Sequence, residues 1–160
     1  MELNAIPLTI PDGANVILGQ SHFIKTVEDL YEAIVGISSQ VKFGLAFSEA
    51  SGPCLIRKAG NDPDLEAIAV ENARKVAAGH TFHILMKDAF PINFLAAIKA
   101  CPEVCGIFCA TANPVQVIVA ETDQGRGILG VIDGSSPQGV EGPDDITARH
   151  NFLRQIGYKL

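Results

Sequence analysis

The sequence predicts an α/β fold, specifically a layered α/β/α sandwich with a mixed parallel and antiparallel sheet. Short apolar runs typical of buried strands alternate with segments of helical periodicity through the first two-thirds of the chain. Later apolar runs are joined by turns too short for a crossover helix, which indicates antiparallel pairing there. The strands are apolar almost throughout, so both faces of the sheet are expected to be covered.

The first strand is expected over residues 14–19, between an Asp-Gly turn and a glycine. A helix follows, with Thr26 as its expected N-cap and Gly36 as its end. Strands are then expected over 42–48 and 54–56. These predictions leave residues 20–25 as a loop that joins a strand end to a helix start.

Asp62, as an N-cap with a proline at the first helical position, predicts the next helix, which ends at Gly79. A strand over 81–86 and a helix over 92–98 follow. The remaining expected elements are strands over 105–110, 115–119 and 127–132 and an amphipathic helix over 144–156.

Length and composition limit the class of protein. With 160 residues and 17.0 kDa, the chain is expected to form a single domain over residues 1–160. The hydrophobic fraction of 48% excludes intrinsic disorder. The net charge of −6 comes without any basic run, which argues against nucleic-acid binding.

The expected location is the cytoplasm. No apolar segment reaches the ~18 residues that a membrane-spanning helix needs. The N-terminus lacks the basic and apolar regions of a signal peptide. We therefore expect no membrane partner, and we expect the four cysteines to be thiols, three of them (Cys101, Cys105 and Cys109) as buried small residues.

His22 is the first candidate for chemistry, because it lies between an expected strand and the N-terminus of an expected helix. Ligands of open α/β sheets collect at the carboxyl ends of strands, and free N–H groups at a helix start attract anions. An imidazole there would act as a base or as a nucleophile toward a phosphoryl group. The alternative is a loop histidine that bonds only to neighbouring backbone.

Two further histidines flank the start of the strand over 81–86. His80 follows a helix end, where functional and structural interpretations are evenly balanced. His83 is expected to be a packed or exposed residue, and His150 is expected to be structural. Because His80 and His83 are three residues apart on a strand, they point to opposite faces and do not suggest a shared metal ion.

Polar residues at strand ends and turns give weaker signals. Thr111 and Asn113 follow an apolar strand among small residues, which suits the floor of a ligand site. Arg126 stands between two glycines, so its guanidinium could approach a phosphate or carboxylate, although an exposed turn arginine is the simpler interpretation. Glu49 follows a strand and is a candidate for a cation or a ribose.

Beyond these single residues, the chain resembles the adenosine-specific kinase family along nearly its whole length and in the same order of segments. The strings that carry the resemblance are GQSHFIKTVEDLYEA (19–33), KFGLAFSEASG (42–52), AGHTF (78–82), PIN (91–93), CGIFCATANPVQVIVAET (105–122) and GRGILGVIDG (125–134).

The resemblance implies a compact α/β protein that forms homo-oligomers and binds adenosine and AMP in preference to ADP and ATP. It also implies one phosphorylated histidine, for which His22 and His80 are the best matches. The position of His22 between strand and helix favours it. His83 departs from the family pattern, where an apolar residue is expected.

The expected site follows from this resemblance. Phe23, Phe47 and the segment 110–113 would form an apolar slot for the base. Glu49 or Asn113 would meet the ribose, while the helix N–H groups and Arg126 would hold phosphate oxygens. Mg²⁺ is expected only as the usual companion of nucleotide phosphates.

Three functions therefore remain open at this stage. The first is a phosphotransferase acting on adenosine through a phosphohistidine. The second is a non-catalytic regulator that binds adenine nucleotides, and the third is an oligomeric assembly protein.

Overall fold

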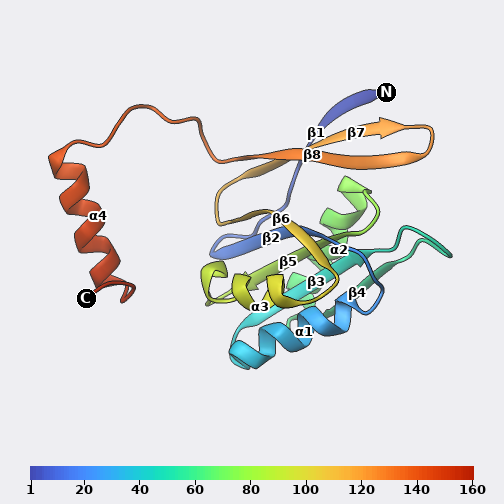
Figure 1. Ribbon diagram of the computed structural model, residues 1–160, viewed down its shortest axis with the longest axis horizontal. Coiled ribbons are helices and arrows are strands. Elements are labelled where there is room, and N and C mark those ends of the chain that lie inside the picture. The colour runs from blue at the N-terminus through green and yellow to red at the C-terminus, as the bar shows by residue number, and fades with distance from the viewer.

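A five-stranded sheet forms the centre of the fold, in the order β4-β3-β5-β2-β6 (Figure 1). A second sheet of three strands, in the order β1-β7-β8, lies against one of its faces. The computed structural model describes all residues, 1–160. The strands are β1 (Glu2–Pro7), β2 (Ala14–Ser21), β3 (Lys42–Ser48), β4 (Ile56–Gly60), β5 (Thr81–Lys87), β6 (Val104–Thr111), β7 (Val115–Thr122) and β8 (Gly125–Asp133).

All neighbouring strands in both sheets pair antiparallel, so the parallel pairing expected from the sequence is not found. The single parallel contact is an isolated bridge between Ala78 and Arg126. The physical reason is strand insertion. The helix after β2 does return the chain in the same direction, but β5 pairs between β2 and β3 and runs against both. In the same way, β3 separates β4 from β5.

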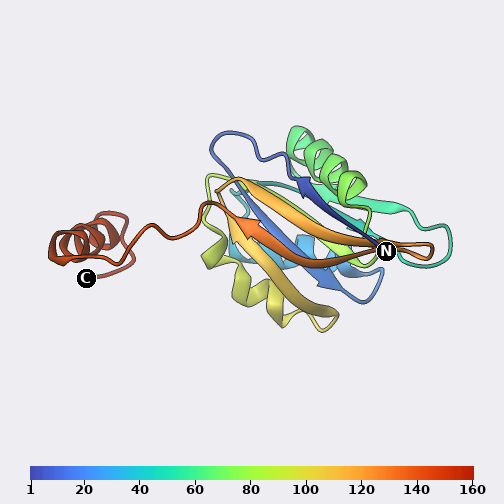
Figure 2. The ribbon, with the colours of Figure 1, turned by 90° about the horizontal axis from the view of Figure 1, so that it is seen from above.

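Helices cover the five-stranded sheet on both faces, as the near-continuous apolar strands predict. On one face, α1 (Thr26–Ile37) and α3 (Leu95–Ala100) bury an apolar cluster that includes Leu30, Phe43 and Ile98. On the other face, α2 (Pro63–Val76) and the three-stranded sheet bury a second cluster of equal size. Figure 2 shows the two sheets stacked, with α2 beside the smaller one.

The two long helices of the body start differently. The Asp62 side chain accepts hydrogen bonds from the N–H groups of Asp64 and Leu65, both 3.1 Å long, so the predicted cap of α2 is confirmed. The predicted cap of α1 is wrong, because the N-cap is Lys25 and Thr26 is already helical. The Thr26 hydroxyl turns inward instead and lies 2.6 Å from the Ser21 hydroxyl.

Three other expectations change. The segment predicted as one helix over 92–98 is a 3₁₀ turn, η1 (Pro91–Asn93), followed by α3. The short strand expected over 54–56 begins only at Ile56. The N-terminal strand β1 was not predicted, because most of its residues are exposed and only β7 pairs with it.

The C-terminal helix α4 (Pro143–Gln155) confirms the predicted tail helix but stands apart from the rest of the fold (Figures 1 and 2). None of its residues is buried. No helix has the length and apolar character needed to cross a membrane.

Candidate active site

The two histidine segments meet at one end of the inner strands of the five-stranded sheet, where β2 and β3 end and β5 begins. This end of the sheet is called the histidine edge. The Ser21 N–H donates to the His80 carbonyl at 2.8 Å, and the His80 N–H donates to the Ser48 carbonyl at 2.8 Å. His80 therefore bridges the ends of β2 and β3. Its φ of +59° lies in the left-handed region, which is uncommon for a residue with a side chain and is worth attention at a candidate site.

The His80 ring is held as well as its backbone. It stacks on Phe47, with ring centroids 5.9 Å apart and planes 15° from parallel. Phe47 is buried at the end of β3, while His80 is half-buried. One face of the imidazole is thus fixed against the core, and the side chain remains partly open to solvent.

His22 lies on the same edge, one residue beyond Ser21. Its N–H donates to the Glu103 carbonyl at 2.9 Å. Its exposed ring packs near Phe23, with centroids 5.8 Å apart and planes tilted by 48°. Phe23 is 50% exposed, which leaves an aromatic face available to a ligand.

Beneath His22 lies a buried polar group that the sequence analysis missed. Glu103 is only 3% exposed, and neither of its carboxylate oxygens has a hydrogen-bond partner. The Lys25 ammonium lies 3.6 Å from it and 2.7 Å from Asp29. The hydrogen bond from Lys25 is the main cause that lowers the pKa of Asp29. Nothing in the loop sequence around Glu103 distinguishes it from a surface carboxylate.

Glu49 organises the loop that approaches His80. Its carboxylate accepts the Leu55 N–H at 2.8 Å and two hydrogen bonds from Arg57, at 2.9 and 2.7 Å. The backbone hydrogen bond from Leu55 is the leading cause of its lowered pKa. The loop passes close to Gly79, where an added Cβ would lie 2.9 Å from that of Ala50.

Arg126 lies at the C-terminal end of α2, at the isolated bridge to Ala78. Its guanidinium donates to the Glu121 carboxylate at 3.0 Å and to the Lys75 carbonyl at 3.1 Å. Its bridge partner, Ala78, is two residues before His80 in the chain. The guanidinium nitrogens of Arg126, however, already have protein partners.

Thr111 and Asn113 lie at the opposite end of the five-stranded sheet from the histidines. Thr111 pairs with Val16 near the start of β2, whereas His22 follows the end of that strand. The Asn113 amide donates to the Asp133 carboxylate at 3.0 Å, and its N–H donates to the Thr111 hydroxyl. The structure therefore joins the backbones of the two histidine segments, whereas Thr111 and Asn113 lie at the other end of the sheet.

His83 is fully buried in the middle of β5, so of the two interpretations the packed one is confirmed. Burial lowers its pKa to about 3, and neither ring nitrogen has a partner. The expectation of buried cysteines is only partly correct. All four are free thiols, and burial raises the pKa of Cys109 to about 11, but Cys105 is exposed.

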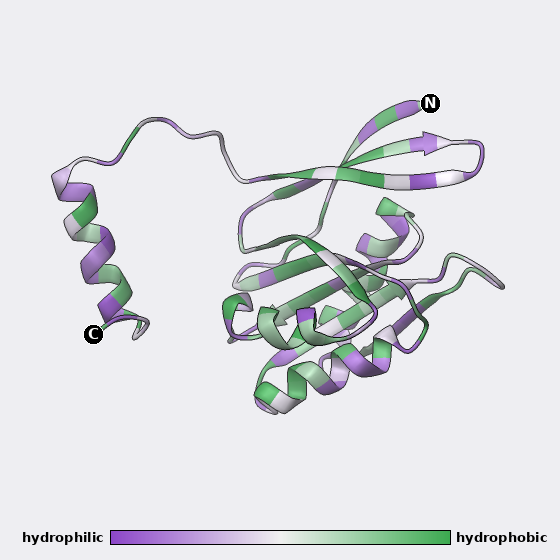
Figure 3. Ribbon diagram, viewed as in Figure 1, coloured by the Kyte–Doolittle hydropathy of each residue, from purple (hydrophilic) through white to green (hydrophobic).

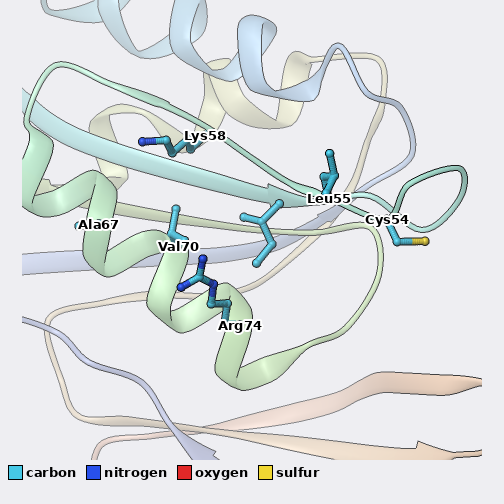
Figure 4. A pocket seen from close by; sticks show the side chains of 7 residues that line it. Cys54, Leu55, Lys58, Ala67, Val70 and Arg74 are labelled. Atoms are coloured by element: carbon cyan, nitrogen blue, oxygen red, sulfur yellow. The ribbon is translucent and has the colours of Figure 1, made fainter.

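A cleft of about 610 Å³ lies between α2 and β4 (Figure 4). Cys54 and Leu55, from the loop that Glu49 organises, also line it. Its walls include Ile56 and Val70, and Arg74 lies beside Val70. A second cleft of about 480 Å³ lies at the end of the sheet that holds Ala112 and Phe90. No group of three or more His, Cys, Asp or Glu side chains is arranged to hold a metal ion.

The fold and this region together define a class: an α/β protein with antiparallel sheets in which two histidine segments meet where β2 and β3 end and β5 begins. A sequence model described as "Adenosine specific kinase" matches residues 6–159. The chain therefore belongs to the adenosine-specific kinase family.

Comparison with solved structures finds the same fold in another protein. The chain is similar to the PH1918 protein from Pyrococcus horikoshii OT3, known from a crystal structure, with 46% sequence identity and a TM-score of 0.95. The match covers 99% of this chain and 98% of that one. No curated protein matches the sequence.

Proposed function

We propose that this protein binds adenosine or AMP at the histidine edge and transfers a phosphoryl group through His80. The observation that carries the proposal is the anchoring of His80, whose backbone is tied on both sides and whose ring rests on Phe47. Family membership supplies the substrate class. The residues around His80 indicate the nucleophile and the aromatic contacts, as follows.

The backbone of His80 supports its assignment as the nucleophile. A left-handed φ at a residue with a side chain costs of order 1 kcal/mol or more, and such strain clusters at active sites. A fixed imidazole also loses less freedom when it attacks, because its orientation is already set. His22 is more exposed than His80, although its place between strand and helix made it the favoured residue from the sequence.

Phosphohistidine is a high-energy phosphoramidate, so it persists only where water and general acids are kept away. The Phe47 ring shields one face of His80. In this proposal His22 sits at the mouth of the site and contacts the nucleotide, because its ring and that of Phe23 face outward together.

The transfer has two balanced steps. A neutral imidazole nitrogen of His80 attacks the terminal phosphorus of a nucleoside triphosphate, forming an N–P bond as the P–O bond breaks and the diphosphate leaves with the electron pair. The 5′-hydroxyl of adenosine then attacks that phosphorus and loses its proton to solvent, and the imidazole leaves unchanged. The products are AMP and a nucleoside diphosphate.

The other predicted site residues take different parts in this proposal. Phe23 and Phe47 offer aromatic faces for the base. Glu49 positions the loop over Gly79 rather than binding ribose, because Leu55 and Arg57 already occupy its oxygens. Arg126 stiffens the adjacent bridge, and Thr111 and Asn113 lie outside the site.

Mg²⁺ enters the proposal only as the ion carried by the phosphates of the donor, which is its usual mode of binding. No step of the transfer is assigned to the ion. We also propose the cytoplasm as the location, where nucleoside triphosphates are at hand.

The test combines binding with labelling. Isothermal titration of the protein with adenosine, AMP and ATP should show tighter binding of the first two. Incubation with γ-labelled ATP should then give an acid-labile, alkali-stable adduct of one phosphate by intact mass, and adenosine should discharge it as AMP.

Each outcome of this test decides something. Binding of adenosine or AMP without any phosphate adduct after incubation with ATP would favour the non-catalytic regulator over the phosphotransferase. No binding of any adenine compound would overturn both.

A further inference from the structure

The cleft between α2 and β4 takes no part in the proposed function and has the features of a second ligand site. Its volume of about 610 Å³ lies within the usual range for small-molecule pockets. Five of its seven lining residues are hydrophobic, and none of the seven is acidic. Because the whole chain carries a net charge of −6, a cleft lined only by apolar and basic side chains stands out from the rest of the surface.

One wall of the cleft belongs to α2. Ala67, Val70 and Arg74 are spaced three and four residues apart, so they lie on one side of the helix. They are turned away from Leu65 and Ala69, which α2 buries against the sheet. Figure 3 shows hydrophobic and hydrophilic residues alternating along α2, as this division of faces requires. The helix therefore presents a small apolar stripe with a cation at its end.

The other wall is β4, an edge strand of the five-stranded sheet, together with the loop before it. Ile56 and Lys58 are two residues apart on β4, so both lie on the face that α2 covers. Leu55 precedes them and is 50% exposed. Its backbone is paired with Glu49 in both directions, through its N–H at 2.8 Å and its carbonyl at 3.0 Å. This wall is therefore fixed before any ligand binds.

The cleft holds one cation without a partner. Lys58 is already neutralised, because its ammonium lies 2.6 Å from the Glu66 carboxylate, an ion pair that links β4 to α2. Arg74 donates no hydrogen bond and forms no ion pair. The other four arginines all donate hydrogen bonds within the chain: Arg57, Arg126, Arg149 and Arg154. Arg74 thus carries the one guanidinium of the chain that is free to bind an anion.

The direction of the Arg74 side chain places this charge beside the apolar wall. Figure 4 shows the side chain running back along α2 toward Val70, while the sulfur of Cys54 is directed away from both. Long helical side chains favour this direction, toward the N-terminus of the helix. A free cation beside apolar side chains suits a ligand that has an anionic head and an apolar body.

The walls also indicate the class of that ligand. No aromatic side chain lines the cleft, so a purine finds nothing to stack on here, in contrast to the histidine edge with Phe23 and Phe47. Aliphatic walls suit an alkyl chain. A single guanidinium matches the planar fork of one carboxylate, whereas a phosphate monoester carries about −1.5 to −2 charges and would exceed the one free cation.

We propose that the cleft between α2 and β4 binds a small aliphatic carboxylate, with the carboxylate on Arg74 and the chain along Val70 and Ile56. The helix advances about 10 Å from Ala67 to Arg74, which is comparable with an alkyl chain of medium length. The proposal is independent of the adenosine chemistry at the histidine edge.

The first test is isothermal titration of the full-length protein with decanoate, below its micellar concentration. Binding should be saturable, and in the series hexanoate, octanoate and decanoate each added methylene should tighten it by up to about fourfold. Decanol, which lacks the charge, should bind at least ~10-fold more weakly than decanoate. Decyl phosphate should also bind more weakly than decanoate.

Variants of Arg74 test the head group. Arg74→Gln should weaken decanoate binding at least ~10-fold, and Arg74→Lys, which keeps the charge but loses the fork, should lie between the two proteins. Lys99→Gln is the matched control, because it removes an equal charge from α3, on the opposite face of the sheet. It should leave binding unchanged. Arg74 and Lys99 are both exposed, and the thermal transition checks that each variant folds.

Methyl NMR spectra locate the bound chain. Decanoate should shift the methyl signals of Leu55, Ile56 and Val70 in proportion to its occupancy. Shifts confined to Ile146 and Leu153 of α4 would show detergent-like association with another apolar surface and would overturn the proposal. The proposal also fails if binding does not saturate, if Arg74→Gln binds as tightly as the wild type, or if decanol or decyl phosphate equals decanoate.

Discussion

Two histidines three residues apart, one before β5 and one within it, show how position alone changes the chemistry of a side chain. His80, at the edge of the sheet, is half-exposed, has a left-handed backbone and stacks on Phe47. His83, in the interior, is fully buried among strands and has its pKa lowered to about 3. The end of the sheet therefore holds an imidazole that solvent partly reaches, and the interior holds one that is kept neutral.

The largest expected effect concerns the edge. His80→Asn should lower phosphate incorporation at least ~10³-fold, about 4 kcal/mol of transition-state stabilisation, because the attacking nitrogen is lost. Asparagine is chosen because it tolerates a left-handed backbone. Intact mass after incubation with ATP measures the adduct, and the thermal midpoint should barely move.

His22→Asn is the matched control for that substitution. It should leave the adduct in place and weaken only nucleotide binding. An adduct that survives in His80→Asn and disappears in His22→Asn would reverse the assignment.

The next prediction concerns the interior of the protein, where α2 packs on β3. An added Cβ at Gly44 would lie 2.0 Å from the backbone nitrogen of Glu66, because α2 rests directly on β3. Gly44→Ala should therefore lower the free energy of unfolding by about 3 kcal/mol. Urea denaturation measures this change.

Gly36→Ala, in α1, is the control for Gly44→Ala, since nothing lies within 4 Å of its added methyl group. It should raise the free energy of unfolding by ~0.5–1 kcal/mol. Equal effects of the two substitutions would show that α2 does not pack tightly on β3.

The third prediction concerns pH and His83. Its pKa in the folded state, about 3, lies below the ordinary value of 6.5, so between these values only the unfolded chain takes up the proton. Stability should fall as the pH falls through this window, by about 1.4 kcal/mol per unit, or about 2 kcal/mol from pH 6.5 to pH 5.

The comparison with His83→Leu isolates this contribution. The variant lacks the titrating group. The slope of its free energy of unfolding against pH, between pH 6.5 and pH 5, should therefore be smaller by up to about 1.4 kcal/mol per pH unit. Parallel curves for the two proteins would mean that His83 gains a proton in the folded state.

The smallest expected effect is at the start of α2, the helix that covers the interior face. Asp62→Ala should lower the free energy of unfolding by about 1 kcal/mol, because two N–H groups lose their acceptor. Asp62→Asn retains an acceptor and should cost only a few tenths of that. If Ala and Asn behave alike in urea, the cap is not what stabilises this helix start.

Local signals predicted most elements of the fold but not their pairing. Asp62 and Pro63 marked the start of α2 correctly because capping is a local interaction. The antiparallel pairing predicted for the later strands is confirmed. The parallel pairing predicted for the earlier strands is not found, because strand order depends on which segment inserts between β2 and β3, and no local pattern records that β5 does so.

The candidate site divides along the same line. His22 and His80 were found as polar residues at strand ends, and the structure places their segments together. Thr111 also follows an apolar strand in the sequence but lies at the other end of the sheet, because β6 runs against β2. Glu103 gave no signal, since its burial arises from packing between distant segments.

The insertion of β5 also bears on how the chain acquires its fold during synthesis. Strand β2 pairs only with β5 and β6, which follow it by some 60 to 90 residues. Until those segments leave the ribosome, the apolar residues 14–21 have no strand of this chain to pair with. During that time they are exposed to aggregation unless a chaperone covers them. Closing such long loops is slow, so this topology favours late, nearly all-at-once folding once residue 111 has emerged.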